Sequence, residues 1–132
     1  MDLTYTKEVL KHLKSPKNMG KIKNPDGEGM VGNRVCGDIM KMYLKIIKNE
    51  KGEEIISDIK FQTLGCGAAI ATSSVLTTLA KGKTIKEALK ISKDDIIQAL
   101  GGLPAIKVHC SILADEALKK AVENYCSTLK QH

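Results

Sequence analysis

Three cysteines lie far apart in the sequence, and each stands where one element is expected to end or begin. Cys36 precedes the first clear strand pattern, Cys66 sits between Gly65 and Gly67, and Cys110 precedes the last helical pattern. The gaps are too long for paired Cys-x-x-Cys knuckles, so the three thiols can converge only through the tertiary structure. Two of them are expected to open helices, where unpaired backbone N–H groups and the helix dipole stabilise a thiolate.

Two neighbouring side chains can complete a set of four ligands. Asp38 follows Cys36 closely, and His109 directly precedes Cys110. Three thiolates with one harder ligand suit a metal ion or an iron–sulfur group that is meant to be exchanged. Both residues also have a structural interpretation, because Asp38 can form a turn and His109 can cap or pack. We interpret Cys126 as a small buried side chain near the apolar stripe of the last helix.

The first half of the chain predicts one short helix followed by an antiparallel sheet. The helix is expected over residues 4–14, and a short, weakly specified strand over residues 30–35. Apolar residues alternate over residues 39–48, and a hairpin loop at 49–52 leads to a strand over residues 55–64. The residues expected to face the core are Met40, Met42, Leu44 and Ile46 in the first of these strands and Ile55, Ile59 and Phe61 in the second.

The second half of the chain predicts helices only. A buried helix of small and apolar residues is expected over residues 68–80. Two capping-box patterns predict short helices over residues 85–90 and 96–100. A long amphipathic helix is expected over residues 111–129. Its predicted buried stripe consists of Leu113, Ala114, Ala117, Leu118, Ala121, Val122 and Tyr125.

Charge and the N-terminal sequence narrow the class of protein. Lys and Arg total 21 against 15 Asp and Glu, which gives a net charge of +6. The lysines are spread along the chain, Arg34 is the one arginine, and no basic patch with interleaved aromatic residues indicates a nucleic-acid binder. We favour a solvated lysine-rich surface, with a basic face for an acidic protein partner as the alternative. No signal peptide or membrane-spanning stretch is evident, so we expect a cytoplasmic protein with reduced cysteines rather than disulfides.

Several segments of the chain are similar to one known family. They are residues 35–38 (Val-Cys-Gly-Asp), residues 63–74 around Gly-Cys-Gly, residues 107–114 around His-Cys-Ser, Tyr5, and residues 15–20. Together they resemble the IscU/NifU-type iron–sulfur cluster assembly scaffolds over essentially the whole chain. The resemblance implies an α+β fold in which a small three-stranded antiparallel sheet packs against helices, with a long C-terminal helix. It also implies a single scaffold domain over residues 1–132, with about the first thirty residues partly flexible.

The resemblance also implies how the cysteines are used. Cys36, Cys66 and Cys110 would carry a transient [2Fe–2S] cluster with Asp38 or His109 as the fourth ligand, and Zn²⁺ would be an alternative occupant. Cys110 would accept persulfide sulfur from a cysteine desulfurase, Fe²⁺ would bind among the ligands, and a ferredoxin-type reductant would supply electrons. The finished cluster would pass to apo iron–sulfur proteins. The chain is therefore expected to be a non-catalytic scaffold rather than an enzyme, with no nucleic-acid or membrane partner.

One segment departs from the family pattern. The family's docking motif for an Hsp70-type chaperone and its co-chaperone reads Leu-Pro-Pro-Val-Lys, whereas this chain has Leu103, Pro104, Ala105, Ile106 and Lys107. Without the second proline, the extended segment is less preorganised, which raises the ordering cost of chaperone binding.

Other functions are consistent with the same residues. A structural zinc-binding interaction module, or a zinc-dependent sulfur-transfer acceptor, needs only the three cysteines and one further ligand, and the structural module predicts Zn²⁺ that does not exchange. A zinc hydrolase with Asp38 as its base is less consistent, because three thiolates reduce the Lewis acidity of the metal.

Overall fold

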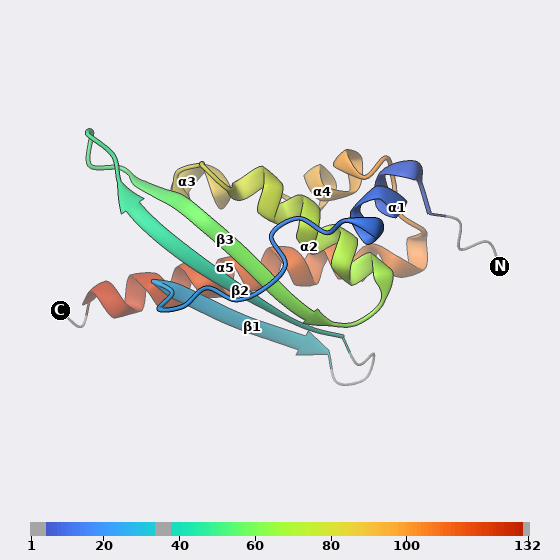
Figure 1. Cartoon of the computed structure of the whole chain (residues 1–132), viewed down its shortest axis with the longest axis horizontal. Helices are drawn as coiled ribbons and strands as arrows, with labels where there is room; N and C mark the ends of the chain where they lie inside the picture. The colour runs from blue at the N-terminus through green and yellow to red at the C-terminus, as the bar shows by residue number, and fades with distance from the viewer. Residues whose placement is uncertain (1–4, 34–37, 131–132) are drawn as a thin grey trace.

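The computed structural model describes residues 5–33 and 38–130, with the backbone alone at positions 33, 38, 129 and 130. In chain order the elements are α1 (Lys7–Lys14), β1 (Gly27–Asn33), β2 (Asp38–Lys48), β3 (Glu54–Leu64), α2 (Gly67–Ala80), α3 (Ile85–Ala88), α4 (Lys93–Ala99), the 3-10 turn η1 (Ala105–Lys107) and α5 (Val108–Lys130). The predicted α+β class is confirmed, with a three-stranded antiparallel sheet, helices packed against it and a long final helix (Figure 1). In this described part of the chain, no helix combines the length and apolarity needed to cross a membrane.

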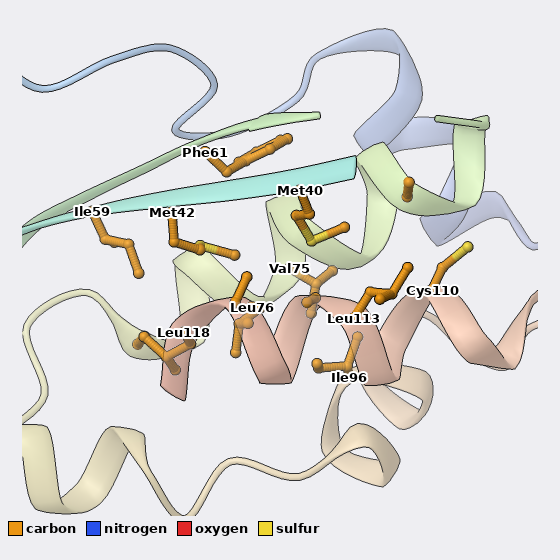
Figure 2. Packing of buried hydrophobic residues seen from close by; sticks show 14 of the residues in the cluster. Met40, Met42, Ile59, Phe61, Val75, Leu76, Ile96, Cys110, Leu113 and Leu118 are labelled. Carbon is orange, nitrogen blue, oxygen red and sulfur yellow. The ribbon is translucent and has the colours of Figure 1, made fainter. Parts of the chain in front are cut away.

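The sheet turns one face toward the helices. Its strand order is β1-β2-β3, and both neighbouring pairs are antiparallel. Met40, Met42 and Leu44 of β2 are fully buried, as their alternation predicts, because successive side chains of a strand point to opposite faces. In Figure 2, the side chains of Met40 and Met42 point from β2 toward α5. The core therefore lies between this face of the sheet and the helices.

The predicted facing of β3 is wrong at one position. We expected Ile55 to face the core, but Ile55 is half-buried and Ile56 is fully buried instead. The register between β2 and β3 shifts between Lys45 and Ile46. The extra residue of this β-bulge shifts the alternation of inward and outward side chains by one position. Even-numbered residues of β3 therefore face the core on one side of the bulge, and odd-numbered residues face it on the other. Beyond the bulge the strand faces as predicted, and Phe61 is fully buried.

Two helices form the other side of the core. The buried stripe predicted for α5 is confirmed, since all seven of its residues are buried. In α2, alanine, serine and threonine side chains are buried on nearly every side of the helix, because it packs against α1, β3 and α5 together. The strand β1 approaches α5 so closely that a Cβ placed on Gly29 would lie 2.4 Å from the backbone nitrogen of Ala121. This close approach fixes the position of β1 along α5.

The segment that follows α1 covers the outer edge of β3. The backbone N–H of Phe61 donates to the carbonyl of Asn18 at 3.0 Å, and the N–H of Gly20 donates to the carbonyl of Phe61 at 2.8 Å. On the inner side, His12 Nδ1 lies 2.7 Å from Ser74 Oγ in α2. Figure 1 shows the chain then running across the sheet to the start of β1. The backbone groups at this part of the edge are thus already paired, which disfavours edge-to-edge association.

Both predicted capping boxes are present. Thr84 Oγ1 accepts from the N–H of Glu87 at 3.0 Å, and Ser92 Oγ accepts from the N–H of Asp95 at 3.2 Å. Because a capping residue stands directly before the first helical residue, α4 begins at Lys93, three residues earlier than predicted.

The prediction for Cys126 is wrong, because its side chain is exposed. Tyr125 belongs to the buried stripe of α5, and the next residue is rotated by about 100° around the helix axis. The rotation places Cys126 off the stripe.

Candidate metal centre

Cys66 caps the start of α2. Its backbone is extended, with φ of −77° and ψ of 176°, as at an N-cap position, and its carbonyl accepts from the N–H of Ala69 at 3.0 Å. In the described structure no side chain caps this helix and its first turn contains no acidic residue. The unpaired N–H groups therefore create a positive potential at Cys66. The expectation that this cysteine opens a helix is confirmed.

Cys110 lies in the first turn of α5 rather than directly before it. The helix begins at Val108, three residues before the predicted start, and the 3-10 turn η1 leads into it without a break. Pro104 is extended as expected, with ψ of 139°, but Ala105–Lys107 are turned rather than extended. Cys110 is fully buried. Figure 2 shows it at the margin of the labelled core residues, with its sulfur pointing away from them.

The two helix starts bring two predicted ligands together. The Sγ atoms of Cys66 and Cys110 are 3.8 Å apart. A disulfide bond would measure about 2.05 Å, whereas two thiolates bound at 2.3 Å to one tetrahedral ion would be about 3.8 Å apart. Cys110 Sγ also lies 3.6 Å from His109 Nε2, close to the roughly 3.5 Å expected for sulfur and nitrogen ligands of one such ion. The Cys110 sulfur is therefore at a distance suited to binding one metal ion jointly with Cys66, and also at a distance suited to binding one jointly with His109.

Two of the five predicted ligands are not placed by the structure. Cys36 lies outside the described residues, and Asp38 is described only by its backbone, which pairs with Asn33 where β1 and β2 meet. Ile39 at the start of β2 pairs with Leu64 at the end of β3, so β2 begins at the end of the sheet from which the chain continues to Cys66. Among the side chains that the structure describes, no three His, Cys, Asp or Glu residues are arranged to hold a metal ion. The full ligand set remains a prediction.

The imidazole of His109 makes a contact with its own turn. Its Nδ1 atom lies 3.1 Å from the carbonyl oxygen of Ile106. A proton on Nδ1 would donate to this carbonyl, and Nε2, which lies 3.6 Å from Cys110 Sγ, would then carry no proton. Metal-binding histidines commonly have such a second partner, which fixes the tautomer and the ring orientation. The same contact also fits the capping role, so both interpretations of His109 remain.

Lys107 places a positive charge beside the thiols. The negative charge of the Cys66 thiolate raises the pKa of the Lys107 ammonium group, and Tyr5 and Cys110 act in the same direction. From the sequence, Lys107 was predicted only as part of the chaperone motif, and its place beside the thiols was not expected. The available signal was its position three residues before Cys110 at the start of a helix.

The remaining residues of the predicted chaperone motif lie on the surface beside this site. Leu103 packs partly against the core, whereas Ala105 and Ile106 are exposed. At 55% exposure, Ile106 is an apolar side chain available to a partner.

Comparison with known proteins identifies close relatives. The family model of the NifU-like N-terminal domain matches residues 4–132. An iron–sulfur cluster assembly scaffold protein of Archaeoglobus fulgidus, IscU, is 55% identical over 121 residues, which cover 92% of this chain and 76% of the relative. The IscU scaffold protein of Escherichia coli is 45% identical over 128 residues, which cover 95% of this chain and 96% of the relative. The crystal structure of a NifU-like N-terminal protein from Brucella abortus shares the fold, with a TM-score of 0.70 at 18% identity, covering 92% of this chain and 93% of that one.

Proposed function

The chain belongs to the family of NifU-like N-terminal domains, and from this membership we propose that it assembles a transient [2Fe–2S] cluster and transfers it to apo-proteins. The general role, a scaffold for iron–sulfur cluster assembly, follows from the family and from its IscU relatives. The proposal of a [2Fe–2S] cluster is supported by the 3.8 Å separation of the Cys66 and Cys110 thiols at the starts of two helices. This spacing suits two ligands of one iron.

In this proposal the cluster is cargo that the protein holds and then releases. Cys36, Cys66 and Cys110 supply three thiolates, and Asp38 or His109 supplies the fourth ligand. A carboxylate in that position adds one negative charge more than a neutral imidazole and matches iron less well, so it favours release. Zn²⁺ suits the same donor atoms and is the alternative occupant.

Cys110 is the proposed sulfur acceptor. Its thiolate attacks the outer sulfur of a persulfide on a cysteine desulfurase, the sulfur–sulfur bond of the donor breaks, and the donor cysteine leaves as a thiolate. The position of Cys110 in the first turn of α5 favours the thiolate form that this attack requires. Two electrons then cleave the new persulfide to hydrosulfide and restore the Cys110 thiolate; a ferredoxin-type reductant supplies one, and Fe²⁺ that becomes Fe³⁺ supplies the other. The hydrosulfide loses its proton as it binds to the iron held among the ligands.

The proposed partners follow from these steps. They are a cysteine desulfurase, a ferredoxin-type reductant, apo iron–sulfur proteins as acceptors, and an Hsp70-type chaperone with its co-chaperone at residues 103–107. The scaffold itself catalyses no reaction, works as a single domain over residues 1–132, and is cytoplasmic. No nucleic-acid or membrane partner is proposed.

The test is an anaerobic assembly reaction. Apo-protein is mixed with a cysteine desulfurase, cysteine, a reductant and Fe²⁺, the visible spectrum is followed, and apo-ferredoxin is then added. A cluster spectrum that grows and then moves to the ferredoxin supports the proposal. The Cys66→Ser variant should build no stable cluster, whereas the Cys126→Ser variant should match the parent, because Cys126 is exposed and lies outside the ligand set.

The main rival is a structural zinc module, because the same sulfur–sulfur spacing suits tetrahedral Zn²⁺. If the zinc-loaded protein were put through the same reaction, kept its Zn²⁺ and formed no cluster, that result would favour the zinc module and contradict the scaffold.

A further inference from the structure

The outer side of α1 carries a concentrated positive charge that the assembly site does not use. Lys7, Leu10, Lys11 and Lys14 are spaced at i, i+3, i+4 and i+7, which places them on one side of the helix. All four are exposed, and Leu10 is 53% exposed. We call these four residues the α1 outer face.

Among the described residues, no salt bridge neutralises this face. Within the described part of the chain, none of its three lysines forms a salt bridge, whereas Lys41, Lys45, Lys81 and Lys119 each do. Residues 7–23 contain six lysines, and Glu8 is the one acidic residue among them. Lys7 and Lys11 are four residues apart, a spacing at which like charges on a helix repel each other. A partner that supplies negative charge would relieve this repulsion.

The α1 outer face lies next to the assembly site. Leu13, which flanks this face, packs so closely over Gly67 that a Cβ there would lie 3.1 Å from Leu13 Cδ2, and Gly67 directly follows Cys66. Figure 1 shows α1 at the end of the molecule where α2 and α5 begin. A protein bound to α1 would thus be separated from the start of α2 by about one helix diameter, roughly 10 Å.

The small size of the α1 outer face indicates which kind of partner it can bind. α1 has 8 residues, which gives a length of about 12 Å. That is too small for the roughly 1,600 Å² of a stable complex, but it suits the weak electron-transfer encounters at the low end of interface sizes. A membrane is disfavoured because the other apolar residues of α1 pack inward and leave Leu10 alone to insert. A single-stranded nucleic acid is disfavoured because the face offers no aromatic ring for stacking.

We propose that the α1 outer face is the docking site for a small acidic electron-transfer protein, with Leu10 as its apolar anchor. This inference rests on the proposed function, because the electrons cleave the persulfide on Cys110. The lysines steer the acidic donor into a short-lived complex beside Cys66, and the complex weakens as salt screens the charges.

A binding titration tests the docking site independently of cluster assembly. An acidic [2Fe–2S] ferredoxin is titrated into the protein, and the exchange-broadened NMR signals of α1 are followed at low and high salt. The charge-reversed variant K7E/K11E/K14E should bind at least about tenfold more weakly at low salt. The matched control K86E/K90E/K93E makes the same charge change at exposed positions of α3, α4 and the intervening turn, and it should bind like the parent. L10A should weaken binding several-fold.

An assembly reaction then distinguishes an effect on the electron donor from an effect on the other partners. With reduced ferredoxin, the charge-reversed variant should build cluster at least about tenfold more slowly than the control. With dithionite as the reductant, the two variants should build cluster at the same rate.

Ferredoxin that does not bind the parent, or that binds both triple variants equally, would overturn the docking site. Loss of binding to phosphatidylserine vesicles by the charge-reversed variant, with the ferredoxin-driven rate unchanged, would assign the face to membranes and also overturn it. A parent protein that binds ferredoxin through α1 but builds no cluster with either reductant would contradict the proposed function alone.

Discussion

The contact between β1 and α5 predicts that Gly29→Ala will impair both stability and metal binding. A Cβ at position 29 would lie 2.4 Å from Ala121 N and 2.7 Å from the carbonyl carbon of Lys120, whereas ordinary contact begins at 3.4 Å. The strand and the helix must therefore separate by about 1 Å, and both atoms belong to helical backbone that cannot rotate away. Overpacking of this kind costs about 1–3 kcal/mol, and we expect the upper part of that range.

Thermal unfolding and chelator competition measure the two effects. In a domain of this size, 1 kcal/mol corresponds to about 3–5 °C in Tm, so the variant should melt about 10 °C below the parent. The same displacement moves the end of β1, which leads to Cys36, relative to the start of α5. Zn²⁺ affinity should therefore fall by about tenfold or more, as when the support of a ligand is lost.

Gly52→Ala is the matched control. Gly52 has a φ of +79° and no atom within 4 Å of the added Cβ, so the substitution should cost about 1–2 kcal/mol through backbone strain alone. Its Zn²⁺ affinity should equal that of the parent. If Gly29→Ala matched this control in both Tm and affinity, the close approach of β1 to α5 would neither limit stability nor position the ligand loop.

Three further predictions concern single side chains. Cys110→Ser should abolish the transfer of labelled persulfide sulfur while leaving the circular dichroism spectrum unchanged; label that still arrived would assign the acceptor role to another thiol. Hydrogen bonds from the backbone and side chain of Thr84 lower the pKa of Glu87 below 4.5, so its stabilising contribution is present above that pH and disappears as pH falls through the lowered value. The Tm difference between the parent and Glu87→Gln should therefore shrink below pH 4.5, and a difference independent of pH would contradict the capping charge. Cys126→Ser should change the free energy of unfolding by less than about 0.5 kcal/mol, because the side chain is exposed.

Local rules predicted most of the fold. The alternation in β2, the capping boxes before α3 and α4, and the apolar stripe of α5 each depend on residues close in sequence, so their signals are complete within one element. Ile56 is buried in place of the expected Ile55 because of the bulge, which depends on how β3 pairs with β2. That pairing is a property of two strands and could not be inferred from the pattern of one.

The site was predicted unevenly for a similar reason. The glycines beside Cys66 and the adjacent His109–Cys110 pair are visible in the sequence. They correctly indicated two helix starts, at which the Cys66 and Cys110 sulfur atoms lie 3.8 Å apart. The influence of Cys66 on Lys107 was not predicted because it arises only when the starts of α2 and α5 lie together. Cysteine and histidine are uncommon residues that bind metals, so they stand out in the sequence as candidate ligands. A lysine is common, and its proximity to the thiols depends on the fold and cannot be read from the sequence.

On the proposed function, the way α5 joins both halves of the candidate site would let one small domain both hold and release a cluster. Its first turn carries His109 and Cys110 and packs with α2, whose start is capped by Cys66, so these ligands are tied to two mutually buried helices. The third cysteine follows β1, whose position depends on the glycine contact with the middle of α5. A shift of β1 along α5 would therefore move the predicted third ligand while the Cys66–Cys110 pair stayed in place. If Cys110 accepts sulfur and Cys36 is the third ligand, as proposed, this arrangement would keep the accepting thiol fixed, and a partner that shifted β1 would change the geometry at Cys36 and release the cargo.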